Sequence, residues 1–224
     1  TAGSTFTVTN GTFDKSTWTF TGTVTSAYHL HVAIFDTLWY SNYLIMNRSG
    51  PTFTADIAQD TINATLTSGT LDLRGNKLTC TDTLTINGGI ISSTLNSINI
   101  DTNFIWHTSG TISTAAGYDV MIGTTGTARG FTLYTITTGG NVYIGSNRAP
   151  RNVTINGSIS RTSAGGTCSI YSARDITLNN DVGTFSTIYF YVDQGDYGLA
   201  NVTVNGGSYI YASSAFYIEP KLTT

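Results

Sequence analysis

The chain has 224 residues, of which 10% are charged, and its formal net charge is −3. A globular chain carries about 25% charged residues, and a nucleic-acid-binding protein carries a basic cluster that this chain lacks. The composition therefore argues against a cytosolic surface and against nucleic acid as a partner. No apolar run approaches the roughly 18 residues that a membrane span requires, so no membrane-spanning segment is predicted.

Residues 1–68 form the first predicted region, which is rich in strands but lacks the repeat that follows. Alternating apolar and polar residues predict short strands, for example those that begin at Phe6 and Trp18. We interpret this region as a β-rich cap or as the first coils of the repeat, and a strand donated to a neighbouring subunit is an alternative. The segment from Phe6 to Val24 is the candidate contact element for assembly.

A strand-and-turn phrase recurs in the second region, residues 69–224. Apolar–Thr–apolar–Asn runs begin at Leu84, Val153, Ile176 and Val202, and the first interval between them is three times as long as the second. Apolar residues on both sides of an outward Thr have the period of a strand, and Asn or Gly suits the turn after it. The prediction is an all-β parallel β-helix (β-solenoid) with coils of about 20–26 residues and an N-terminal β-rich cap. The residues expected to point inward are Leu84, Ile86, Val153, Ile155, Ile176, Leu178, Val202 and Val204.

These strand–Asn–Gly phrases resemble the right-handed parallel β-helix of secreted and cell-surface proteins from bacteria and archaea. The resemblance implies three short sheets along the stack, a filled interior, and a ladder of stacked asparagines at one corner, here Asn87, Asn156, Asn179 and Asn205. The fold hosts lyases, hydrolases, tailspikes, adhesins and envelope proteins, so the fold alone does not select a function. Low charge and high Thr content make the chain most similar to surface-layer, sheath or adhesin-type proteins.

Catalytic chemistry finds little support in the sequence. Glu219 is the one glutamate and the aspartates are scattered, so the paired carboxylates of glycoside hydrolysis are not apparent. Asp193 and Asp196 form a close pair in a glycine turn, where turn chemistry explains them and a calcium site is the alternative. We predict no catalytic residue, no metal site and no cofactor.

The histidines do not change this prediction. His29 and His31 share one face of a strand and are a candidate metal pair, but no third ligand lies within reach by sequence. His107 follows the run Phe104-Ile-Trp and is expected at a turn.

The two cysteines, Cys80 and Cys168, are predicted to be either half-buried thiols or disulfide partners. Four coils separate them at about 4.8 Å per coil, which is too far for a bridge within one chain. If a disulfide forms, we therefore expect it between subunits.

Glycosylation sequons are dense, although a chain rich in Asn, Ser and Thr also generates them by chance. Two of them share one outward column, where an attached glycan would project into solvent. The six candidate asparagines are Asn10, Asn47, Asn63, Asn152, Asn156 and Asn201.

Tyrosines mark the last coils. Four of them alternate with apolar residues: Tyr189, Tyr191, Tyr209 and Tyr211. They are candidates for a sugar-stacking face or a subunit interface, and they also suit a strand for their size alone.

The threonines do not indicate ice binding. A flat ice-binding face would need two constant Thr columns, and the aligned strands offer only one.

The function predicted from these observations is a non-enzymatic structural protein of the cell envelope or extracellular surface. It is expected to self-assemble into a layer, sheath or filament, with other copies of itself and attached glycans as partners. An adhesin or carbohydrate-binding module is the first alternative, and a polysaccharide lyase or hydrolase is the second. The start at Thr1, without a signal peptide, agrees with a processed extracellular chain.

Overall fold

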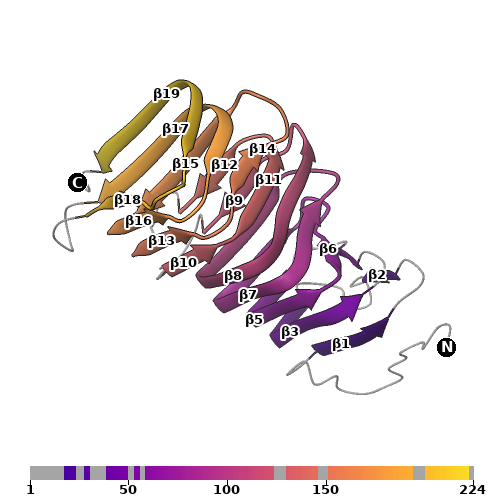
Figure 1. Cartoon of the computed structure of the whole chain (residues 1–224). Coiled ribbons are helices and arrows are strands. Elements are labelled where there is room, and N and C mark those ends of the chain that lie inside the picture. Colours follow the sequence, from indigo (N-terminus) through magenta and orange to yellow (C-terminus); the bar gives the residue numbers. More distant parts are fainter. Residues whose placement is uncertain are drawn as a thin grey trace, which may run out of the picture.

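The computed structural model describes residues 18–23, 28–30, 39–49, 53–55, 59–123, 130–145, 151–193 and 200–221, and side chains between residues 63 and 219 apart from the same gaps and residue 193. Within these residues every regular element is a strand, and the 19 strands pair in parallel as the coils of a β-solenoid (Figure 1). The predicted all-β parallel solenoid is confirmed.

Each coil passes through three sheets, which we call sheets 1, 2 and 3 in the order in which the chain visits them. Some strands lie in one sheet only. Those of sheet 1 are β1 (Trp18–Thr23), β10 (Gly130–Leu133), β13 (Asn152–Ile155), β16 (Asp175–Leu178) and β18 (Val202–Val204). Those of sheet 2 are β2 (Tyr28–Leu30), β4 (Phe53–Ala55), β6 (Thr70–Asp72), β11 (Thr135–Gly139) and β14 (Ile159–Arg161), and those of sheet 3 are β9 (Val120–Ile122), β12 (Val142–Ile144) and β15 (Thr167–Ser172). The strands that bend around corners are β3 (Trp39–Ser49), β5 (Gln59–Ser68), β7 (Lys77–Ser93), β8 (Ile98–Ala116), β17 (Val182–Asp193) and β19 (Ile210–Lys221).

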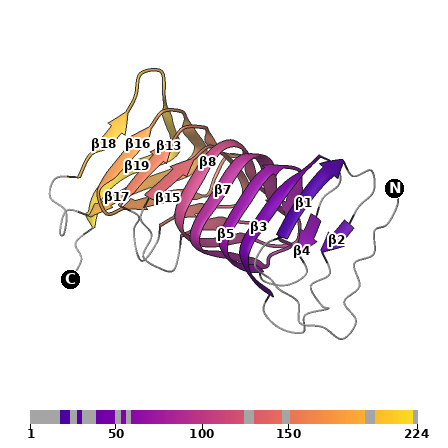
Figure 2. The same cartoon turned by 90° about the horizontal axis from the view of Figure 1, so that it is seen from below.

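The N-terminal strands are bonded to the same stack. β1 pairs with β3, β3 with β5 and β5 with β7, all in parallel, and Figure 2 shows these strands side by side. Of the alternatives that the sequence left for residues 1–68, these strands pair as first coils do. A role of the region in assembly stays a prediction.

The strand register fixes the length of each coil. Most offsets between paired residues lie in the predicted range: Ala64 with Leu84 is at its lower limit, and Ile176 with Val202 is at its upper limit. The offset is shorter between β4 and β6 and over the first part of the pairing between β5 and β7, and it is longer between β17 and β19. Coil length therefore varies along the stack, and the turns between strands absorb the difference.

Apolar side chains fill the interior as columns that run along the stack. In sheet 1 the column from Leu84 passes through Ile105, Phe131 and Val153 to Ile176, and each of these side chains is at most 2% exposed. Neighbouring coils cover each other's inward residues, so burial depends on having a coil on both sides. Six of the eight predicted inward residues are fully buried: Leu84, Ile86, Val153, Ile155, Ile176 and Leu178.

The last strand of sheet 1 keeps the predicted inward register, but its inward residues are not fully buried. Val202 is half-buried and Val204 is 44% exposed, although both are in register with buried residues of β16. Their strand, β18, lies in the last described coil, where no further strand of the described chain covers them.

The predicted asparagine ladder forms over three coils at one corner of the stack. The Asn179 side-chain amide donates to the Asn156 carbonyl oxygen at 2.8 Å, and the Asn205 amide donates to Asn179. Asn87 lies outside this ladder, because the next coil places Thr108 beside it, and the Thr108 hydroxyl donates to Asn87 at 3.0 Å.

Candidate functional site

The end of the last described coil exposes side chains that belong to the core by register. Phe216 pairs with Ile188 and Ile218 pairs with Phe190 in sheet 3. Ile188 and Phe190 are 0% exposed, whereas Phe216 is 40% and Ile218 is 52% exposed. Together with Val204, these residues form an apolar surface, which we call the coil end.

Within the described residues, the strands at the coil end are paired on one side alone. Among the described strands, β18 pairs only with β16, and β19 pairs only with β17. The outer edge of each strand therefore presents backbone donors and acceptors, as any sheet edge does. Figure 1 places these two strands at one end of the stack and β1 toward the other. The coil end thus combines apolar side chains with a parallel-strand edge.

The tyrosines of sheet 3 form a stacked ladder along the solenoid. The ring centroids of Tyr171 and Tyr191 are 4.4 Å apart, those of Tyr189 and Tyr191 are 5.5 Å apart, and those of Tyr189 and Tyr217 are 5.0 Å apart. All three pairs are within 12° of parallel. Each ring in the middle of the ladder therefore has its faces covered by other tyrosines.

Burial, together with neighbouring groups of the ladder, raises the pKa of two of its hydroxyls. Burial is the main cause that raises the pKa of Tyr191 to about 12, and the charges of Tyr171, Glu219 and Tyr189 act in the same direction. Burial is also the main cause that raises the pKa of Tyr171. Tyr171 and Tyr191 therefore hold their protons more tightly than free phenols, and the acidic residue Glu219, which pairs with Tyr191, lies beside the ladder.

The other two predicted tyrosines lie elsewhere. Tyr209 and Tyr211 flank Ile210, which pairs with Val182 in sheet 2, and their rings are tilted by 32° at 5.8 Å. They are 57% and 58% exposed. The four candidate tyrosines therefore do not form one face, because the chain turns between sheets after each pair.

The predicted sequons are partly placed. Asn152, Asn156 and Asn201 are exposed, and Asn63 is half-buried. Asn152 pairs with Asp175, whose carboxylate accepts from the backbone N–H of Asn201 at 3.0 Å, so the shared outward column is confirmed. The side chain of Asn47 in β3 and all of Asn10 lie outside the described residues.

Both cysteines lie in the core. Cys80 and Cys168 are thiols with 0% exposure, and burial strongly raises the pKa of the Cys168 thiol. A disulfide between subunits needs a thiol at the surface, and the folded coil offers neither one there.

His107 is the largest departure from the sequence-based assignments. The sequence predicts a turn here, but His107 lies inside β8, points inward and is 0% exposed. Its Nδ1 accepts from the backbone N–H of Tyr134 at 3.2 Å, while its Nε2 has no hydrogen-bond partner within bonding geometry. Burial lowers its pKa to about 4, and a backbone interaction with Gly110 offsets this only in part. The alternation of β8 places it inward, and that signal was available in the sequence.

The described residues bring together no catalytic constellation that we can identify. In that part of the chain no group of three or more His, Cys, Asp or Glu side chains could hold a metal ion, and no helix is long and apolar enough to cross a membrane. The pair Asp193 and Asp196 and the pair His29 and His31 fall, at least in their side chains, outside the described residues.

Comparisons with protein-family models, with curated proteins and with solved structures find no match to this chain. Its own surfaces are therefore the evidence for its function.

Proposed function

We propose that this chain is a non-enzymatic structural protein of the cell envelope or extracellular surface, whose copies assemble end to end. The observation that carries the proposal is the coil end, where Val204, Phe216 and Ile218 occupy core positions and are 40–52% exposed. Soluble monomers seldom leave core positions in contact with water, and an apolar surface of this kind marks an interaction site.

The energy available at the coil end is large enough to matter for association. Burying one side chain of this size completely is worth about 1.5–3 kcal/mol, so covering the exposed half of three contributes about 3 kcal/mol. Backbone pairing along β18 and β19 adds directionality, because a parallel strand must approach in register. The resulting contact is a β-strand addition between copies.

Among the described strands of sheet 1, β1 lies at the opposite edge, and we propose it as the partner strand of a second copy. β1 pairs with β3 on one side, and the register through successive coils places Thr19 in the same column as Thr203. Both edges read apolar–Thr–apolar, as Trp18-Thr-Phe and as Val202-Thr-Val. One end of a copy thus meets the other end of the next, and such a heterologous contact produces an open polymer.

The composition supports an extracellular setting for this polymer. Low charge allows close approach of copies, and the exposed sequons at Asn152 and Asn201 lie on the outward side of sheet 1, away from the coil end's inward column. Attached glycans would therefore decorate the side of the filament and leave its ends accessible.

The test places a charge at the coil end. We expect Ile218→Lys to leave the chain folded and to prevent polymer formation, because a buried ammonium at the contact has no partner. The matched control is Leu95→Lys. Leu95 is 53% exposed and Ile218 is 52% exposed, but Leu95 lies in the turn after β7 and does not belong to the coil end. Electron microscopy and sedimentation velocity measure the assembly. A wild-type chain that stays monomeric, or an Ile218→Lys chain that polymerises like the Leu95→Lys control, would refute the proposal.

The opposite end has its own test. Deleting residues 1–26 removes β1, and we expect the truncated chain to remain monomeric. A truncated chain that forms the same polymer contradicts the assignment of the N-terminal contact element.

A further inference from the structure

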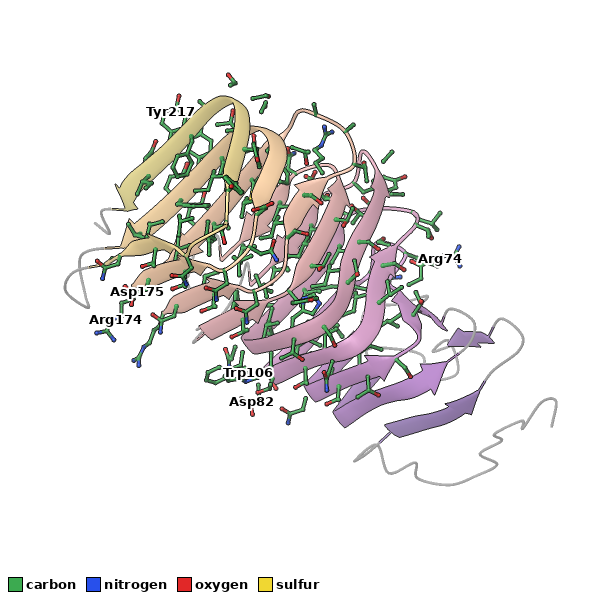
Figure 3. The ribbon with its side chains drawn as sticks, viewed as in Figure 1. Arg74, Asp82, Trp106, Arg174, Asp175 and Tyr217 are labelled. Carbon is green, nitrogen blue, oxygen red and sulfur yellow. The ribbon has the colours of Figure 1, made fainter. Side chains whose placement is uncertain are left out.

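Trp106 is an exposed aromatic residue on the outward face of sheet 1. It lies in β8 between Ile105 and His107, which are 1% and 0% exposed and point inward, so the strand alternation directs Trp106 outward. Its side chain is 53% exposed. Figure 3 shows it projecting from the lower side of the stack, near Asp82.

The fold does not require tryptophan at this position. Register places Trp106 between Thr85 of β7 and Thr132 of β10. From β5 to β18, all the remaining described coils carry threonine in this outward column: Thr65, Thr85, Thr132, Thr154, Thr177 and Thr203. Because threonine occupies the strand at each of those positions, the solenoid does not require an aromatic side chain there.

The outward side chains around Trp106 are aromatic or carry hydroxyl groups, and we call this surface the Trp106 platform (Phe104, Trp106, Thr83, Thr85, Gly130 and Thr132). Phe104 is half-buried at the preceding outward position and pairs with Gly130. A Cβ at Gly130 would meet no described atom within 4 Å other than those of its chain neighbours, so a side chain could be added at that position. Thr85 and Thr132 flank the indole at the strand spacing of about 4.8 Å. The platform itself carries no charged side chain.

This combination fits a sugar ring. A pyranose has a face of C–H groups, which packs on an aromatic plane, and a rim of hydroxyls, which pairs with threonine hydroxyls. None of these six side chains is basic, and the acidic residue Asp82 lies near Trp106 (Figure 3), so the site favours a neutral sugar over a uronate or a phosphorylated ligand. We propose that the Trp106 platform binds a neutral glycan chain, with one pyranose ring lying on the indole of Trp106.

The tyrosine ladder is a weaker site for the same chemistry. Its rings stack on one another at 4.4–5.5 Å, so their faces are already covered and mainly edges remain. No described aromatic ring stacks on Trp106, and its column neighbours are threonines. The geometry therefore favours Trp106 in sheet 1 over the tyrosine ladder as the carbohydrate site.

A panel of soluble hexasaccharides tests the proposal: cellohexaose, chitohexaose, xylohexaose and maltohexaose as neutral probes, and hexagalacturonate as a charged one. Binding is measured by calorimetry and by the tryptophan emission of the full chain. We expect at least one neutral probe to bind and to be preferred over hexagalacturonate. Trp106→Ala should weaken this binding by about tenfold or more, while Trp106→Phe should retain part of it. The matched control is Tyr211→Ala, which removes a 58% exposed aromatic from sheet 2 and should leave binding unchanged.

Two results would overturn the glycan site. One is that no neutral probe binds the wild-type chain, and the other is that Trp106→Ala binds as tightly as wild type. Circular dichroism of each variant checks that the solenoid remains folded, and Trp106→Phe covers the case in which Trp106→Ala does not fold. The Ile218→Lys variant should bind the same probe as wild type, so a failure of end-to-end assembly is distinguishable from a failure of the glycan site.

Discussion

Acidification should destabilise the solenoid through one buried imidazole. His107 is 0% exposed, its Nδ1 accepts from the Tyr134 backbone, and burial lowers its pKa from 6.5 to about 4. Because the folded-state pKa lies below the unfolded-state value, the unfolded chain binds more protons between pH 6.5 and pH 4. Stability is therefore fully present above pH 6.5 and falls as the pH drops through this window.

The magnitude follows from the two pKa values. One pKa unit corresponds to about 1.4 kcal/mol, so lowering the pH from 7 should cost about 1 kcal/mol at pH 5.5 and about 3 kcal/mol at pH 4 through His107 alone. A loss of this size is a substantial part of the about 5–15 kcal/mol that stabilises a typical domain.

Urea unfolding at pH 7, 5.5 and 4 measures this effect as a change in the free energy of unfolding. The comparison variant is His107→Leu, which fills the inward position without a titratable group. It leaves the Tyr134 N–H without its acceptor, so we expect it to be about 1–3 kcal/mol less stable at pH 7. Its stability should nevertheless fall less steeply with acid than that of the wild type, by about 3 kcal/mol at pH 4. Equal pH dependence in the two proteins would show that folded His107 protonates without penalty.

Two further predictions concern the core. Val153→Asp should destabilise the chain by about 4 kcal/mol or more, because it places an isolated carboxylate at a 0% exposed position. The control Thr154→Asp, on the outward side, should change stability by roughly 0.5 kcal/mol or less. Equal losses of stability in urea unfolding would contradict the inward register of β13. Cys80 and Cys168 should react with a thiol reagent only after denaturation, because both are fully buried and burial raises the pKa of Cys168; rapid labelling of the folded chain, or an assembly loosened by reductant, would show that a thiol reaches the surface.

The sequence predicts which side chains point inward where this depends only on the alternation of apolar and polar residues along one strand. In the phrases that begin at Val153 and Ile176, a period of two residues places two apolar side chains inward and one Thr outward, and the following Asn suits the corner. The approximate coil length followed from the spacing of these phrases. The ladder of Asn156, Asn179 and Asn205 followed from the resemblance, because equal phrases stack in equal register.

Contacts between coils decided the features that the sequence left open or assigned wrongly. The phrase at Val202 reads like that at Val153, yet Val204 is 44% exposed, because burial in a solenoid requires a coil on each side. The side-by-side placement of Trp106 with Thr85 and Thr132 likewise comes from register between strands that are a full coil apart in the sequence.

The sequence by itself therefore determined the repeating strand, its turn and the all-β parallel stack, since each depends on neighbouring residues along one strand. Only the tertiary structure decided that Val204, Phe216 and Ile218 are exposed at core positions of the last described coil, and that the tyrosines of sheets 2 and 3 point in different directions. These properties depend on which residue the next coil places above or below a given side chain. That pairing depends on the length of every intervening turn, which ranges too widely here to be read from one repeat.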